Sequence, residues 1–160
     1  MGTIVDMERE EFQRLVHSNF KFLIDEFGFA VELLDIPGLL PEKFKGWRLF
    51  YQNATTGVAI TYDQLDRLPS VIIHKLHGDQ RLPLGILIVT RNPELNPLRH
   101  EKGFPLSKSP EDFLKEWASA LRLLGTDVLR GDFSSFPFLE EELQRRINLR
   151  MADPKNFTYF

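Results

Sequence analysis

The chain has 160 residues, of which 42% are hydrophobic and 27% charged, with 14 Phe, no Cys and a formal net charge of -3. This length and composition predict one globular domain with an aromatic-rich core, and the lack of cysteine excludes disulfides, thiolate zinc sites and cysteine nucleophiles. Because the basic residues form no stripe along the sequence, we expect no nucleic-acid partner.

The first residues and the longest apolar run of the chain indicate in which cellular compartment it is expected. The first residues show neither the basic start nor the apolar run of a secretory signal peptide. The longest apolar run, 84–89, is far shorter than the roughly 20 residues that a membrane span needs. We therefore expect a cytoplasmic protein with no membrane partner.

The first element is a helix predicted over residues 6–27. Large apolar residues recur there at spacings of three and four with charged residues between them, which is the pattern of a half-buried helix. They are Phe12, Leu15, Val16, Phe20, Leu23 and Phe27. Gly28 follows as a left-handed C-terminal stop.

From residue 29 the apolar period changes to two, which predicts strands over 29–34, 47–53, 58–63 and 71–76. The loop 53–57 ends in Gly57 and predicts a hairpin between the second and third strands. Because the connections are short, we expect the strands to pair antiparallel in chain order.

Glycine and proline recur at short intervals through residues 77–108. Residues 86–90 predict either a fifth strand or a short buried helix. Residues 91–108 are expected to form an irregular excursion over the surface, and long loops of this kind are often functional.

Two further helices are predicted at the C-terminal end. Ser109 and Pro110 open the first, which Gly125 ends, and a turn through 128–132 leads to the second at 136–151. The last helix has acidic residues near its start and basic residues near its end, as the helix dipole favours. The tail after it carries three aromatic residues that either fold back on the sheet or dock on a second copy, so a homo-oligomer is a further expectation.

Together these elements predict an α+β fold with an antiparallel meander sheet of four or five strands. The N-terminal helix and the two C-terminal helices are expected to pack on one face. The other face is then either solvated or covered by residues 91–108 and the tail.

Few residues suggest chemistry. His74 and His77 are three apart, so on a strand their imidazoles point to opposite faces and no metal site is expected. Asp63 and Asp66 flank a turn, where Asp usually caps backbone N–H groups, although paired carboxylates also perform acid and base catalysis. If a pocket forms between the sheet and residues 91–108, Arg48 joins these four as its nearest polar residues.

Several short motifs are better explained by local structure or by chance. Arg130-Gly131-Asp132 spells an adhesion tripeptide but fits a tight turn, and Asn53 and Asn156 begin glycosylation sequons that occur often by chance. No phosphate loop, nucleophile elbow or dinucleotide fingerprint is present, so the sequence assigns no catalytic residue and no cofactor.

Residues 20–29 (FKFLIDEFGF) and 125–133 (GTDVLRGDF) flank the strand-rich middle. In this layout the chain resembles a loose group of small uncharacterised bacterial α+β proteins, some of which are similar to immunity proteins that neutralise toxins. The resemblance carries over no catalytic residue. It favours a non-enzymatic protein-interaction module with another protein as its partner. The alternative is a small ligand-binding domain or enzyme with a pocket between the sheet and residues 91–108.

Overall fold

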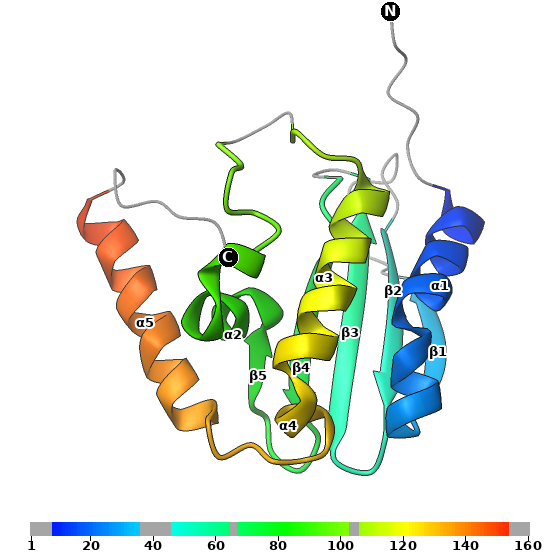
Figure 1. Cartoon of the computed structure of the whole chain (residues 1–160), viewed down its shortest axis with the longest axis horizontal. Helices are drawn as coiled ribbons and strands as arrows, with labels where there is room; N and C mark the ends of the chain where they lie inside the picture. Colours follow the sequence, from blue (N-terminus) through cyan, green and yellow to red (C-terminus); the bar gives the residue numbers. More distant parts are fainter. Residues whose placement is uncertain (1–7, 36–45, 65–66, 103–105, 154–160) are drawn as a thin grey trace, which may run out of the picture.

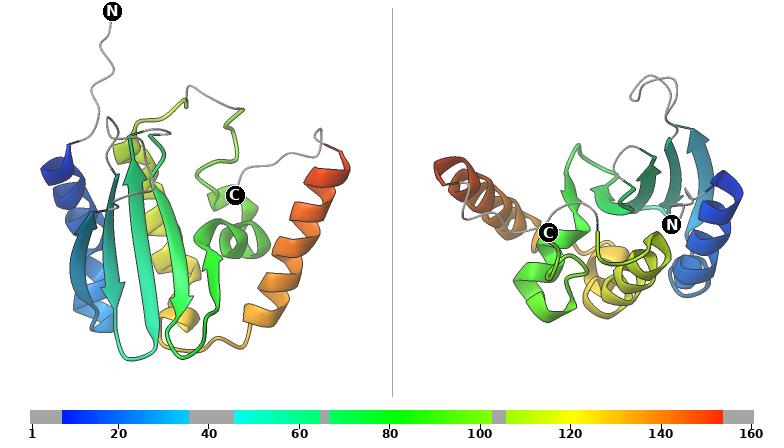
Figure 2. Two further views of the ribbon diagram at one scale, coloured as in Figure 1. Left: turned by 180° about the vertical axis from the view of Figure 1, so that it is seen from behind. Right: turned by 90° about the horizontal axis from the view of Figure 1, so that it is seen from above.

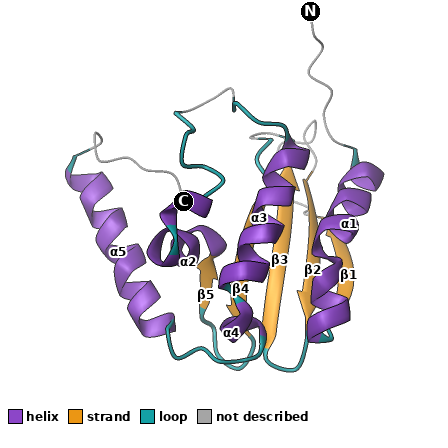
Figure 3. Cartoon of the chain, in the orientation of Figure 1, coloured by secondary structure: helices purple, strands orange, loops and turns teal. Residues whose placement is uncertain are grey.

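The computed structural model describes residues 8–35, 46–64, 67–102 and 106–153. It confirms the predicted α+β class, because five strands form one antiparallel sheet in chain order, preceded by one helix and followed by others (Figure 1). Figure 3 shows the strands as a single layer with helices in front of it. The meander follows from the short connections, which place each strand beside the next one along the chain.

All four predicted strands are present, each displaced by no more than two residues. The strands are β1 (Ala30–Asp35), β2 (Gly46–Gln52), β3 (Thr56–Asp63), β4 (Ser70–Lys75) and β5 (Arg81–Pro83). The predicted hairpin is confirmed between β2 and β3. Its turn is closed by the Asn53 side chain, which accepts hydrogen bonds from the backbone N–H groups of Thr55 (3.0 Å) and Thr56 (2.9 Å).

The structure decides between the two alternatives for residues 86–90. They belong to helix α2 (Leu84–Arg91), and the fifth strand is the shorter β5 just before it. Every residue from Leu84 to Val89 is buried, as expected of a helix that is apolar on all sides.

The three longer predicted helices are α1 (Arg9–Phe27), α3 (Pro110–Leu124) and α5 (Phe136–Ala152). The expected start of α1 at residues 6 and 7 lies outside the described residues. Gly28 ends α1 with a φ of 69°, and the Ser109 side chain caps α3 by accepting a hydrogen bond from the Asp112 N–H (3.2 Å), so both predicted helix ends are confirmed. The sequence did not predict α4 (Thr126–Leu129) or the short 3-10 helix η1 (Pro93–Leu95).

Helices α1 and α3 cover one face of the sheet (Figure 1). The rings of Trp47 and Tyr62 stack there with centroids 6.0 Å apart, and Phe12 of α1 lies 6.0 Å from Tyr62. Trp117 of α3 donates its indole N–H to the Pro69 carbonyl (3.2 Å). This face therefore holds the aromatic core that the composition predicted.

Helix α5 contacts α2 at the far side of the molecule from α1 (Figure 2, right). Its contribution to the core is limited to Phe136 and Leu139. Hydrogen bonds from Arg91, the last residue of α2, stabilise the start of α5. Arg91 donates to both carboxylate oxygens of Asp127 at 2.7 Å and to Ser135 Oγ at 3.1 Å. These bonds tie α2, α4 and the first residue before α5 together.

The described residues of the 91–108 excursion lie beside α2 and α3. Leu98 is buried in the core, and the ammonium of Lys108 contacts Glu116 of α3 and the Phe113 ring (4.7 Å to its centroid). This part of the excursion therefore packs on the helical side and does not cover the other face of the sheet. The aromatic tail lies outside the described residues.

Among the described helices, none combines the length and the apolar composition that crossing a lipid bilayer demands.

Candidate functional site

The face of the sheet opposite α1 and α3 carries no helix among the described residues (Figure 2, left). We call it the open face. Alternation along the strands places on it Ala30, Glu32, Gly46, Arg48, Phe50, Gln52, Gly57, Ala59, Thr61, Asp63, Ser70, Ile72, His74, Arg81 and Pro83. The intervening residues, such as Leu49 (1% exposed) and Ile60 (0%), face the core.

The strand register arranges the open face in rows. One row runs across all five strands: Glu32 pairs with Phe50, Phe50 with Ala59, Ala59 with Ile72, and Ile72 with Pro83. We call the last four residues the apolar strip. Phe50, Ile72 and Pro83 are half-buried and Ala59 is buried beneath them, so the strip offers contiguous apolar surface in the middle of a sheet face that no described helix covers.

Phe50 is held in place by its neighbours on the open face. Its ring meets the His74 ring edge to face with centroids 5.6 Å apart. It also lies over Gly57, where a Cβ atom would come within 2.6 Å of Phe50 Cζ. Glycine at this position therefore lets the ring settle onto the sheet while part of it stays accessible.

Two guanidinium groups lie on either side of the apolar strip. Arg48 belongs to the row that also holds Thr61, and its Nε donates to Thr61 Oγ1 (3.3 Å). Arg81 lies in the row beyond the strip, paired with His74, and is exposed. Partial burial, together with the positive charges of Arg81 and Arg48, holds the pKa of His74 below its ordinary value of 6.5. His74 is therefore neutral at physiological pH.

The structure brings together some of the residues that the sequence nominated. Arg48, Asp63 and His74 share the open face, where Asp63 ends β3 in the row next to that of Arg48. His77 lies in the turn after β4 with its Nε2 3.0 Å from the Ala54 carbonyl oxygen, and Asp66 lies outside the described residues. No group of metal-binding side chains occurs in the described ranges.

Phe50, Ile72 and Arg81 are central to the open face but were not among the residues that the sequence nominated as a site. Alternation already placed Phe50 on the face of Arg48 and Ile72 on the face of His74, so a signal was present for both. Arg81 had no such signal, because β5 was not predicted.

Two motifs have structural roles. Gly131 has a φ of 90° and packs against Thr55, while Asp132 accepts a hydrogen bond from the Ser134 N–H (3.0 Å), so the tripeptide at 130–132 forms the predicted turn. The Asn53 amide donates to the carbonyl oxygens of Leu129 (3.2 Å) and Phe27 (3.4 Å). Its side chain therefore anchors the β2–β3 turn to the helical layer.

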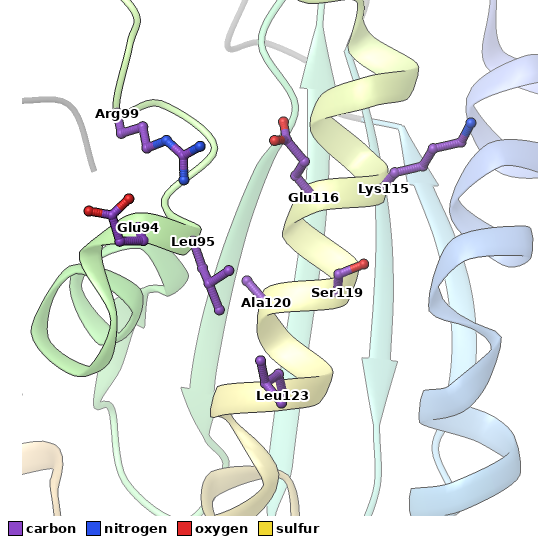
Figure 4. A pocket seen from close by; sticks show the side chains of 8 residues that line it. All are labelled: Glu94, Leu95, Arg99, Lys115, Glu116, Ser119, Ala120 and Leu123. Atoms are coloured by element: carbon purple, nitrogen blue, oxygen red, sulfur yellow. The ribbon is translucent and has the colours of Figure 1, made fainter.

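A hollow of 340 Å³ lies beside α3 (Figure 4). Its apolar surface comes from Leu95, Ala120 and Leu123, and Arg99 faces Glu116 across it. The lining includes no histidine or cysteine and none of the nominated site residues. Because its walls come from α3 and residues 94–99, it differs from the expected pocket between the sheet and the excursion.

Comparison of the chain with protein-family models, with curated proteins and with solved structures found no match. The resemblance to immunity proteins therefore stays a prediction, and the functional conclusion depends on the residues of the open face.

Proposed function

We propose that this chain is a non-enzymatic protein-interaction module, of immunity-like or accessory type, that binds another protein through the open face. The observation that carries the proposal is the half-exposed apolar strip at the centre of a sheet face that no described helix covers. Its mechanism would be masking, in which the bound module covers the partner's functional surface.

The composition of the face supports this function. An apolar centre surrounded by a polar rim is the usual anatomy of a protein interface, and aromatic and arginine side chains supply most of its binding energy. Phe50 and Ile72 form such a centre, while Arg48, Gln52 and Arg81 lie around it. A sheet also presents this surface in one fixed shape, which lowers the entropy cost of binding.

The ligand-binding or enzymatic alternative has weaker support. Of the nominated polar residues that the structure describes, Arg48, Asp63 and His74 lie on the open face in three different rows, and His77 contacts the neighbouring turn. The hollow beside α3 offers a charged rim, but its Glu116 is already paired with Lys108.

Site-specific photo-crosslinking in cells of the native host tests the proposal. A benzophenone amino acid replaces Ile72 on the open face, and the matched control carries it at Arg14, which is exposed on α1. We expect a covalent adduct with one protein from position 72 and not from position 14. The same adducts from both positions, no adduct at all, or an adduct only with a second copy of the chain would contradict binding of a different protein at this face.

A further inference from the structure

We infer that the partner presents acidic side chains to the open face, in a segment where an apolar residue lies between two carboxylates. The inference rests on the proposed function and names the chemistry of the partner. It starts from Arg48 and Arg81, the two cations that border the apolar strip.

Neither guanidinium forms an ion pair with a carboxylate in the described ranges; the only hydrogen bond that either makes there is from Arg48 to Thr61. Other arginines of the chain do have carboxylate partners: Arg91 with Asp127, Arg122 with Glu26, and Arg145 and Arg146 with Glu142. Guanidinium groups beside an apolar surface bind carboxylates strongly, because they offer several donors in one plane and lose little hydration.

His74 lies beside Arg81 and can become a further positive charge on the open face. It is uncharged because partial burial and both guanidiniums disfavour its protonation. A carboxylate placed nearby would reverse that balance, since an opposite charge favours the protonated imidazole. The face can thus gain a third positive charge when an acidic partner binds.

The row spacing predicts the pattern of the partner. Arg48 lies in the row on one side of the apolar strip and Arg81 in the row on the other side. Rows on one face are two residues apart, or about 7 Å, so the two arginine rows are about 14 Å apart along the strands. Arg48 is on β2 and Arg81 on β5, which are three strand spacings or about 14 Å apart across the sheet, so the two residues lie about 20 Å apart on a diagonal. An extended segment that follows this diagonal, with acidic residues at positions i and i+6 and an apolar residue between them, matches this spacing.

The face is less suited to a continuous polyanion. Glu32 stands at the β1 end of the row that forms the apolar strip and is exposed. A nucleic-acid backbone laid across the sheet would meet this carboxylate, whereas a short acidic segment can end before it. The charges therefore favour an acidic protein segment over nucleic acid.

A displayed library of random peptides tests the inference. Peptides that bind the wild-type chain, and that lose binding to the Ile72→Asn variant, are sequenced. We expect them to be enriched in Asp and Glu on both sides of an apolar residue. The synthetic peptides should bind Arg48→Glu/Arg81→Glu at least about tenfold more weakly than wild type.

The matched control is Arg14→Glu/Lys102→Glu, which makes the same change in net charge at exposed positions away from the open face. It should change binding by no more than about twofold. Selection of neutral or basic peptides, or an equal loss of peptide binding in both double variants, would contradict the acidic partner but not the proposed interaction through the open face. Failure to obtain any peptide that depends on Ile72 would count against the proposed function as well. If a labelled single-stranded oligonucleotide binds with the same dependence on Arg48 and Arg81, the inferred acidic protein segment is wrong and the partner is a nucleic acid.

Discussion

His74 reports on the charges of the open face, because its ring lies against Phe50 and its titration responds to Arg81 and Arg48. We expect Arg81→Gln to raise the pKa of His74 toward 6.5, since the variant removes one of the positive charges that disfavour protonation. Titration of the imidazole C–H signals by NMR measures the change. The control Arg14→Gln should leave the His74 titration where it is in the wild type, and a His74 pKa unchanged in Arg81→Gln would show that the two side chains do not interact.

The loss of Arg91 should cost more stability than the loss of Arg122, whose ion pair is more exposed. The side chains of Arg91 and Asp127 are 26% and 32% exposed, whereas those of Arg122 and Glu26 are 60% and 41% exposed. We expect Arg91→Ala to lower the free energy of unfolding by about 2–3 kcal/mol, because it removes several charged hydrogen bonds from a partly buried site. The control Arg122→Ala should lower it by about 0.5 kcal/mol or less. Urea denaturation measures both, and equal losses would contradict the assigned role of Arg91.

The same pair predicts a pH dependence. The hydrogen bonds from Arg91 hold the pKa of Asp127 below its ordinary value of 3.8. The resulting stabilisation is present in full above 3.8 and is lost as the pH falls through the lower folded value. The difference in unfolding free energy between wild type and Arg91→Ala should therefore shrink below pH 3.8. A difference that stays constant into this acid range would mean that Asp127 is not the partner that matters.

At the scale of elements, α5 should be the least stable of the three long helices. Its buried residues, Phe136 and Leu139, both lie in its first turn, whereas α3 buries six residues along its length. Local unfolding is easiest where few side chains are buried. In hydrogen exchange followed by mass spectrometry, we expect the amides of 143–151 to exchange at least about tenfold faster than those of 113–121. Equal protection of the two segments would show that α5 is held by contacts along its whole length.

The length of each element decided whether it could be predicted from the sequence. Alternation identified β1 to β4 because each has six or more residues, long enough for the period to be visible. β5 has three residues and α4 has four, and a period cannot be recognised in so few positions. The run at 84–89 is apolar throughout, so only the structure could separate a buried helix from a buried strand.

The candidate site was predictable only in part for a related reason. Alternation showed that Arg48 and Phe50 share a face, as do Ile72 and His74. It did not show which residues of different strands lie opposite one another, because the register depends on turn geometry as well as on the pattern. The apolar strip emerges only when Phe50, Ala59 and Ile72 are aligned by that register.

At the scale of the whole molecule, the helices form the core with one face of the sheet, and the other face carries the candidate site. The described helices pack on one side or at the far end of the sheet (Figure 2), and the aromatic core between α1, α3 and the sheet lies directly behind the open face. The chain carries a net charge of -3, yet two arginines that form no ion pair among the described residues border its apolar strip. Because Glu32 and Asp63 also lie on the open face, the attraction for a carboxylate comes from the positions of Arg48 and Arg81 and not from the net charge of the face.

The accessibility of single cysteines on β4 tests the open face most directly. The chain has no cysteine, so Ile72→Cys and Ile73→Cys each introduce one unique thiol at neighbouring positions. Ile72 lies on the open face, whereas Ile73 is 1% exposed and faces the core. In the native protein the thiol at position 72 should react with a maleimide at least about a hundredfold faster than the thiol at position 73, which becomes accessible only on unfolding. Equally slow reaction at both positions would mean that the sheet is covered on both sides, and would contradict the open face on which the proposed function depends.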